Sequence, residues 1–133
     1  MEKKIKEGTV IVIDTNVFVD HLRGYAPAVA FFESLGSKED ILFSAITEAE
    51  LVAGQECKEK IKKEGVLQFL GQWNKIIVTN QIAVLAGDLS RDKGIDLPDA
   101  LIAATALVNK AELVTKNVKD FKRIAELSLR VPY

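Results

Sequence analysis

The feature that most constrains this chain is the run TVIVI at residues 9–13, which is apolar after its first residue. Such a run has no polar face, which is typical of a central parallel strand covered by helices on both sides. It ends at Asp14, followed by Thr15 and Asn16, residue types that start turns and cap helices. Because ligands of open α/β sheets bind beyond the carboxyl ends of the strands, Asp14 is predicted to lie at a binding site.

Length and composition indicate a single globular domain. The chain has 133 residues, of which 48% are hydrophobic and 28% charged, and none of its apolar runs approaches the length of a membrane-spanning helix. The charged leader at residues 1–8 precedes an apolar run too short for a signal peptide. Cys57 is the only cysteine, which excludes an intrachain disulfide and a cysteine zinc site. We therefore expect a cytoplasmic protein with no membrane association.

The charge balance does not indicate a nucleic-acid-binding protein, because the net charge is −1 and such proteins usually carry a basic excess. If four of the 19 acidic residues are reserved for a metal site, however, the 18 basic residues outnumber the remaining acids. Lysines cluster between residues 58 and 63 and again between 116 and 122. The first cluster is interpreted as a solvated helix face.

Strand and helix patterns alternate along the chain. Short apolar runs indicate further strands at 41–43, 76–78, 112–115 and 129–131. Helical spacing indicates helices at 15–23, 27–35, 45–55, 66–73, 80–93, 97–108 and 117–123, and a polar helical stretch at 58–64 that Gly65 breaks. This alternation predicts a parallel sheet with helices on both faces.

Four acidic residues fall where strand ends and helix starts should meet: Asp14, Glu50, Asp99 and Asp120. Each has an alternative explanation that the sequence leaves open. Asp14 can cap the next helix, Asp99 can interact with the dipole of the helix that it starts, and Asp120 can be a surface acid.

Glu50 is distinguished from the neighbouring Glu48 by its position on a helical wheel. Glu50 falls beside Ile46, Ala49 and Ala53, whereas Glu48 falls on the polar side. A carboxylate on an apolar stripe is costly unless something compensates it. The wheel therefore predicts that Glu50 has a functional role.

Several converging carboxylates repel one another, and a divalent cation removes that cost. Oxygen ligands without cysteine or a useful histidine select a hard ion such as Mg²⁺ or Mn²⁺. The chemistry that such a site favours is hydrolysis of a phosphodiester.

Four segments resemble motifs of the PIN-domain family, and within it the VapC-type toxin ribonucleases. They are VIDTN at 12–16, TEAEL with Gly54 at 47–54, LPDALIAATA at 97–106 and LVTKNVKDF at 113–121. The segments come in the family's order, and the resemblance extends from about residue 10 to 131, so that the chain is expected to be one PIN domain, 1–133.

The resemblance implies a three-layer α/β/α sandwich with a central, mostly parallel sheet, and an endoribonuclease that depends on Mg²⁺ or Mn²⁺. The catalytic and metal-binding acids that it implies are Asp14, Glu50, Asp99 and Asp120. The polar residues that it places around the pocket are Thr15, Asn16, Ser44, Thr115 and Asn117. Asn117 and Asp120 share the role of fourth acid, because many relatives carry an acid at the position of Asn117.

The resemblance also implies partners. Such toxins typically form homodimers and are inhibited by a VapB-type antitoxin whose C-terminal segment crosses the acidic pocket. The helices at 55–73, with Phe69 and Trp73, match the region that usually contacts the antitoxin, although these two rings can equally be plain core. Two alternatives stay open: an RNA-processing nuclease without an antitoxin, and a catalytically silent PIN module that only binds.

Three other classes of protein are excluded by missing residues. Ribonucleases that use paired histidines need a second one, and His21 is the only histidine, interpreted here as an ordinary helix residue. A response-regulator receiver needs an Asp after the third strand, where residues 78–80 are Val, Thr and Asn. A haloacid-dehalogenase phosphatase needs an Asp two residues after Asp14, where Asn16 stands.

Overall fold

The computed structural model describes residues 9–36 and 39–133, so the leader expected at 1–8 lies outside the described residues. Five strands form one sheet in the order β3-β2-β1-β4-β5, and all its neighbouring strands are parallel. The strands are β1 (Thr9–Ile13), β2 (Glu39–Ser44), β3 (Asn74–Ile76), β4 (Glu112–Val114) and β5 (Leu129–Arg130). The predicted parallel sheet is confirmed.

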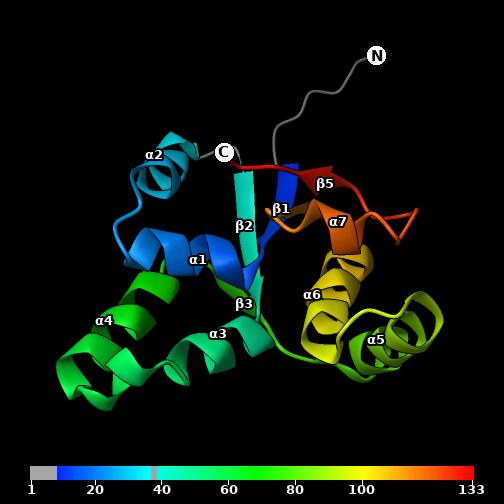
Figure 1. The fold of residues 1–133 in the computed structure, drawn as a ribbon, viewed down its shortest axis with the longest axis horizontal. Coiled ribbons are helices and arrows are strands. Elements are labelled where there is room, and N and C mark those ends of the chain that lie inside the picture. The colour runs from blue at the N-terminus through cyan, green and yellow to red at the C-terminus, as the bar shows by residue number, and fades with distance from the viewer. Residues whose placement is uncertain (1–8, 37–38) are drawn as a thin grey trace.

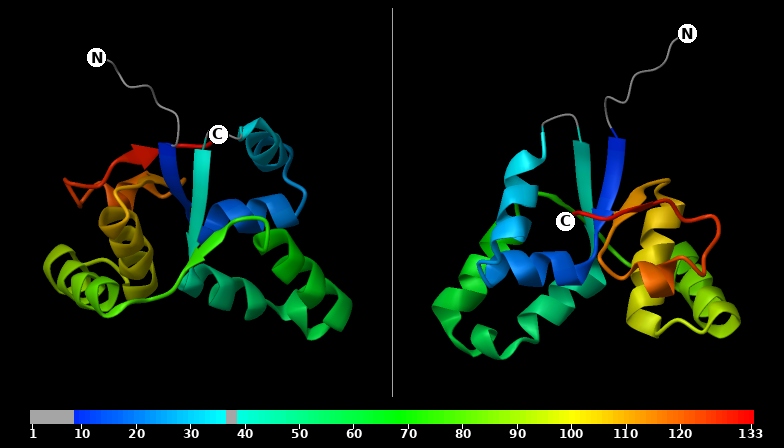
Figure 2. Two further views of the ribbon diagram at one scale, coloured as in Figure 1. Left: turned by 180° about the vertical axis from the view of Figure 1, so that it is seen from behind. Right: turned by 45° about the horizontal axis from the view of Figure 1, so that its top comes forward.

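Helices cover both faces of this sheet, as the predicted three-layer sandwich requires (Figure 1, Figure 2). Helices α1, α2 and α4 pack on one face, α5, α6 and α7 pack on the other, and α3 follows directly from the end of β2. The helices are α1 (Thr15–Leu22), α2 (Ala26–Ser34), α3 (Ala45–Val52), α4 (Lys60–Leu70), α5 (Asn80–Lys93), α6 (Leu97–Val108) and α7 (Val118–Phe121), with a short 3₁₀ helix η1 (Gln55–Lys58).

The central strand β1 separates two hydrophobic cores. Ile11 and Ile13 pack into the core beneath α1, whereas Val12 packs into the core beneath α6, and all three side chains are fully buried. Successive side chains of a strand point to opposite faces, so an apolar residue at every position supplies both cores. The structure therefore confirms the interpretation of the run 9–13.

Two helix boundaries follow from the predicted capping residues. The Ser44 side chain accepts a hydrogen bond from the Ile46 amide and caps α3. Gly94 ends α5 with φ of +67°, a left-handed conformation that glycine adopts without strain. Within the described ranges, no helix is both long enough and apolar enough to cross a membrane.

The predicted break at Gly65 is wrong, because α4 runs through this residue from Lys60 to Leu70. The space beside Gly65 is open, with no atom within 4 Å of the position that a Cβ would take. The glycine therefore destabilises α4 only through the conformational entropy that it loses on folding. Packing of Phe69 and Leu70 into the core beneath α1 outweighs this cost.

The third strand is displaced from its predicted position, since β3 covers 74–76 rather than 76–78. This strand lies at the sheet edge and pairs only with the last residues of β2. Ile77 and Val78 follow it with exposed fractions of 64% and 41%. The prediction of a strand at 76–78 is thus wrong in its bounds, because exposed aliphatic residues cannot be told from buried ones by type.

Candidate active site

Asp14 lies at the carboxyl end of β1, between the neighbouring strand β4 and the start of α1. Its amide donates to the Val114 carbonyl at 2.9 Å, and its carboxylate Oδ2 accepts a hydrogen bond from Thr115 Oγ1 at 2.7 Å. Asp14 occupies the N-cap position of α1, but its side chain makes no helix-capping hydrogen bond within the described ranges, and its backbone partner is the adjacent Thr15. The capping alternative is therefore wrong. Burial raises the pKa of Asp14, although the Thr115 hydrogen bond opposes this shift.

Thr15 joins α1 to α3. Its Oγ1 donates to Glu50 Oε1 at 2.7 Å and lies 2.9 Å from Thr47 Oγ1. Thr15 and Thr47 are both buried. These hydrogen bonds therefore hold the Glu50 carboxylate of α3 next to the start of α1. Thr47 was not predicted as a site residue, although it is the first residue of the TEAEL segment that contains Glu50.

The inward-facing position that the helical wheel predicts for Glu50 is wrong. Ala49 and Glu50 are both exposed, and α3 buries Thr47 and Leu51 instead. A wheel shows which residues share a face but not which face packs inward. Glu48, the rejected alternative, pairs with Lys75 at 3.0 Å on the surface. The contact that separates the two glutamates is the hydrogen bond from Thr15 to Glu50.

Asp99 lies in the first turn of α6, and the charges of the other acids act on its carboxyl group. Its pKa is raised from 3.8 to about 6, first by burial and then by the charges of Asp14, Glu50 and Asp120, with a smaller contribution from Asp96. A role at the helix dipole alone would lower this pKa. The four predicted acids, which come from distant parts of the chain, therefore act on one another electrostatically.

Asp120 is tied to this site through a chain of hydrogen bonds. Asn117 Nδ2 donates to Asp120 Oδ2 at 3.1 Å, and the Asn117 amide donates to Thr115 Oγ1 at 2.9 Å. Because Thr115 in turn donates to Asp14, the chain connects Asp120 to Asp14. Arg123 lies 3.6 Å from the other Asp120 oxygen, a contact that the sequence did not predict.

The remaining predicted pocket residues differ in position. Ser44 is fully buried and its hydroxyl oxygen caps α3. Asn16 is exposed in the first turn of α1, and its side chain has no hydrogen-bond partner among the described residues. Ser44 thus supports the helix that carries Glu50, while Asn16 is open to solvent.

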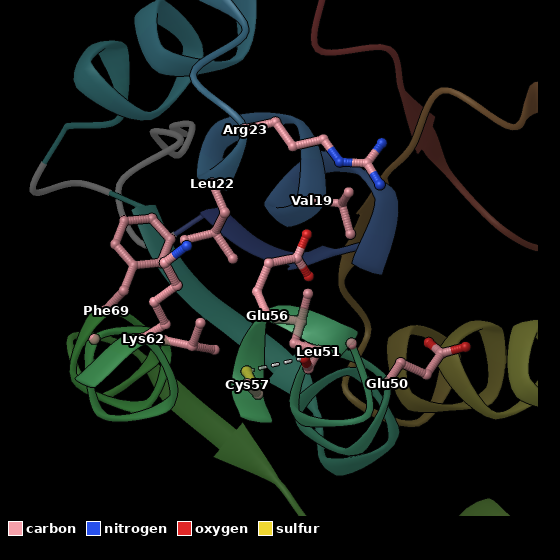
Figure 3. Close-up of a pocket in the computed structure, with 12 residues that line it drawn as sticks. Val19, Leu22, Arg23, Glu50, Leu51, Glu56, Cys57, Lys62 and Phe69 are labelled. Atoms are coloured by element: carbon pink, nitrogen blue, oxygen red, sulfur yellow. Dashed lines mark hydrogen bonds between the residues drawn. The ribbon is translucent and has the colours of Figure 1, made fainter. Parts of the chain in front are cut away.

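A groove of about 600 Å³ extends from Glu50 along α1, α3 and α4 (Figure 3). Its walls are mostly apolar, with two acidic residues, Glu50 and Glu56, and two basic residues, Arg23 and Lys62, among the residues that line it. The apolar wall residues are Val19, Leu22, Leu51, Val66 and Phe69. Phe69 also packs edge-to-face against Phe18 and Trp73 and against the core beneath α1, whereas Trp73 packs there without lining the groove.

The sequence model of the PIN-domain family matches residues 11–127 of this chain, which is most of its length. The chain belongs to the PIN-domain family. The match includes all four acids described above, from Asp14 at the end of β1 to Asp120 in α7.

Relatives of this PIN domain include VapC ribonucleases. Ribonuclease VapC19 of Mycobacterium tuberculosis is 39% identical over 122 residues, covering 87% of this chain and 95% of that protein. Ribonuclease VapC10 of the same organism is 32% identical and covers 89% and 90% of the two chains. The chain is accordingly a VapC-type PIN-domain ribonuclease.

Solved structures with the same fold come from toxin–antitoxin complexes. The toxin–antitoxin complex from Klebsiella pneumoniae contains a chain that is 29% identical, with a TM-score of 0.79 and coverage of 92% of this chain and 98% of that one. VapBC2 from Rickettsia felis, bound to a DNA fragment from its promoter, is 31% identical with a TM-score of 0.77 and the same coverage.

The acidic site of this VapC-type chain fits a hard divalent cation by its donor chemistry, since carboxylate oxygens are the ligands that Mg²⁺ and Mn²⁺ prefer. In the part of the chain that the structure describes, no three Asp, Glu, His or Cys side chains are placed to hold one ion as they stand. The negative charges of Asp14, Glu50 and Asp120 act against the ionised form of Asp99 and raise its pKa. A positive charge placed among these acids would reduce their repulsion.

The raised pKa of Asp99 predicts that the metal-free protein loses stability as the pH rises. The folded state holds this proton more tightly than the unfolded chain, so the free energy of unfolding falls between the unfolded pKa of 3.8 and the folded value of about 6. After discounting for solvent screening, the loss is about 1–2 kcal/mol. Urea unfolding in EDTA at both ends of this range measures it. Asp99→Asn should show a correspondingly flatter pH dependence, and equal slopes for the two proteins would contradict the prediction.

Proposed function

We propose that this protein is the toxin of a type II VapBC pair and hydrolyses RNA phosphodiesters with Mg²⁺ or Mn²⁺. Asp14 and Asp99 are the residues that would hold the ion, with Glu50 and Asp120 beside them. A bound ion supplies positive charge that stabilises the scissile phosphate and lowers the pKa of a water. The observation that supports this proposal is the chain of hydrogen bonds that connects Asp14, Thr115, Asn117 and Asp120, next to which Asp99 has a pKa raised by the charges of the other acids.

The protein's own side chains orient the reaction. Glu50, held at Oε1 by Thr15, is placed to accept a proton from the attacking water. The water oxygen forms a bond to phosphorus, the bond to the 3′ oxygen breaks, and that oxygen takes a proton from solvent. The products are a 5′-phosphate and a 3′-hydroxyl. Thr115 and Asn117 keep Asp14 and Asp120 in position during this step.

The test is cleavage of cellular RNA by the purified protein with Mn²⁺ or with EDTA, followed by mapping of the new 5′ ends. We expect cleavage with Mn²⁺ only, and new ends that carry a 5′-phosphate. Products with a 5′-hydroxyl, or cleavage that persists in EDTA, would contradict the proposed chemistry. The activity belongs in the cytoplasm, where RNA is the substrate and Cys57 stays reduced.

The antitoxin is proposed to bind the groove between α1, α3 and α4. Apolar walls suit an amphipathic segment, and the lining offers both acidic partners, Glu50 and Glu56, and basic ones, Arg23 and Lys62, to charged side chains on it. Similar chains from Klebsiella pneumoniae and Rickettsia felis were solved as toxin–antitoxin complexes. An RNA-processing nuclease without an antitoxin is the alternative, and a small antitoxin gene immediately upstream would decide against it.

Substitution of an aspartate for Val66, a partly buried residue of the groove wall, is expected to weaken antitoxin binding by about 10-fold or more, because it places an unpaired charge in an apolar contact. Titration calorimetry with the purified antitoxin measures this loss. Ile61→Asp is the matched control, since Ile61 is exposed on the same helix and does not line the groove. Equal affinity of the two variants would contradict the placement.

A homodimer is also proposed. Apolar side chains are exposed along the connection from β3 through α5 to the start of α6, and they are Ile77, Val78, Val84 and Leu97. Exposed apolar patches mark interaction surfaces in soluble proteins. Sedimentation equilibrium should therefore give twice the chain mass of 14.6 kDa, and a monomer at micromolar concentration would contradict the proposal.

A further inference from the structure

Lys116 stands between two residues of the acidic site, Thr115 and Asn117, but its own side chain turns to another part of the molecule. Its Nζ lies 2.8 Å from Asp20 Oδ2 on α1. The Tyr133 hydroxyl donates to the same Asp20 oxygen at 2.7 Å. These contacts join segments that are 96 and 113 residues apart in the chain.

Two aromatic rings complete the contact. The Lys116 ammonium lies 5.5 Å from the ring centroid of Tyr25 and 5.1 Å from that of Tyr133, distances at which a cation is attracted to the face of a ring. The two rings are themselves 5.7 Å apart and pack edge to face. Hydrogen bonds from Lys116 and Tyr133 lower the pKa of Asp20, so its carboxylate stays charged.

The position of Lys116 gives this cluster a consequence for the site. The loop between β4 and α7 carries Thr115, which holds Asp14, and Asn117, which holds Asp120. Residues 115 and 117 are the chain neighbours of Lys116, whose side chain is held by Asp20. Greater backbone motion at Lys116 would therefore loosen the hydrogen bonds that Thr115 and Asn117 make. Partly exposed ion pairs contribute little to global stability, and the effect is therefore expected to be local.

We propose that Lys116, Asp20 and Tyr133 form a latch that fixes the loop of Thr115 and Asn117 and thereby positions Asp14 and Asp120. These three residues act through others and do not contact the reacting atoms. The inference rests on the proposed function only for its effect on cleavage. Its effect on the loop itself is independent of any activity.

The test compares variants that change the latch with matched controls. Tyr133→Phe removes only the hydroxyl, and its control is Tyr25→Phe, which alters a tyrosine whose ring alone takes part among the described contacts. Lys116→Ala removes the cation, and its control is Lys75→Ala, since Lys75 has the same side-chain exposure of 43% and a carboxylate partner at 3.0 Å. Lys116→Arg is expected to restore function because it keeps both the charge and the ring contact.

The first measurement is amide hydrogen exchange in the metal-free protein. Exchange at Asn117, whose amide donates to Thr115 Oγ1, should become faster by up to about fivefold in Lys116→Ala, which loses a partly exposed ion pair, and in Tyr133→Phe, which loses a hydrogen bond to Asp20. The second measurement is RNA cleavage, in which kcat should fall about 10-fold with KM unchanged, because a displaced Asp14 or Asp120 weakens stabilisation of the transition state and not binding of the RNA. The two control variants and Lys116→Arg should resemble the wild type in both.

The two measurements separate the possible failures. Unchanged exchange at Asn117 in Lys116→Ala and Tyr133→Phe would overturn the latch, whatever the activity. Faster exchange with unchanged kcat would overturn its role in positioning the acids. A wild-type protein that does not cut RNA would overturn the proposed function, while faster exchange in the variants would still support the latch.

Discussion

Replacement of Asp14 or Asp99 by asparagine is expected to abolish RNA cleavage and to leave the fold intact. Each substitution removes a negative charge from the proposed metal site, and a metal ion supplies several kcal/mol of transition-state stabilisation. The rate should therefore fall by about 1,000-fold or more. In Asp14→Asn the amide side chain still offers an oxygen to Thr115, so the hydrogen bond at 2.7 Å keeps an acceptor. Initial rates on a labelled RNA with Mn²⁺ measure the effect.

Asp96→Asn is the matched control for Asp99→Asn. Asp96 is exposed at the N-cap position of α6, and its side chain makes no capping hydrogen bond within the described chain. This variant should cleave RNA like the wild type. The melting temperature of Asp99→Asn without metal should equal or exceed that of the wild type, because one repelling charge is gone. Near-normal cleavage by Asp14→Asn or Asp99→Asn would remove these residues from the proposed site.

Mn²⁺ is expected to stabilise the wild-type protein strongly against heat. A ligand that binds only the folded state adds about 2.7 kcal/mol at 100 times its Kd. For a domain of this size, this corresponds to a rise in Tm on the order of 10 °C. The effect has a physical source in the structure, because the ion also relieves the repulsion that raises the pKa of Asp99.

The same melting experiment distinguishes an enzyme from a silent PIN module. Asp14→Asn and Asp99→Asn should lose most of the rise in Tm, and EDTA should reverse it in the wild type. NaCl at the same ionic strength controls for general screening of the acids. If the wild type melts at one temperature with and without Mn²⁺, the catalytically silent alternative is the better account of this fold.

Local patterns in the sequence predicted most of the fold. An apolar residue at every position of 10–13 required cover on both faces, and the helices on either side of β1 supply it. Capping chemistry at Ser44 and Gly94 placed two helix boundaries. The local signal failed at Gly65 and at residues 76–78, where tertiary packing rather than residue type decided the element.

The candidate site was predicted from the family's motifs and from the rule that strand ends meet at one edge. Motif order and strand topology brought Asp14, Asp99 and Asp120 to one region without specifying any contact. The helical wheel selected Glu50 for a reason that the structure contradicts, because α3 buries Thr47 and Leu51 and leaves Ala49 exposed.

The sequence by itself determined the succession of strands and helices along the chain, the central strand and the acidic residues at the element junctions. Periodicity, capping and strand-end chemistry act over a few neighbouring residues, so these features can be recognised without the tertiary structure. Only the tertiary structure decided which of these groups touch. The hydrogen bond between Asp14 and Thr115 spans 101 residues, and the contact of Lys116 with Asp20 spans 96. Such pairs are set by the packing of whole elements against one sheet, which local patterns do not specify.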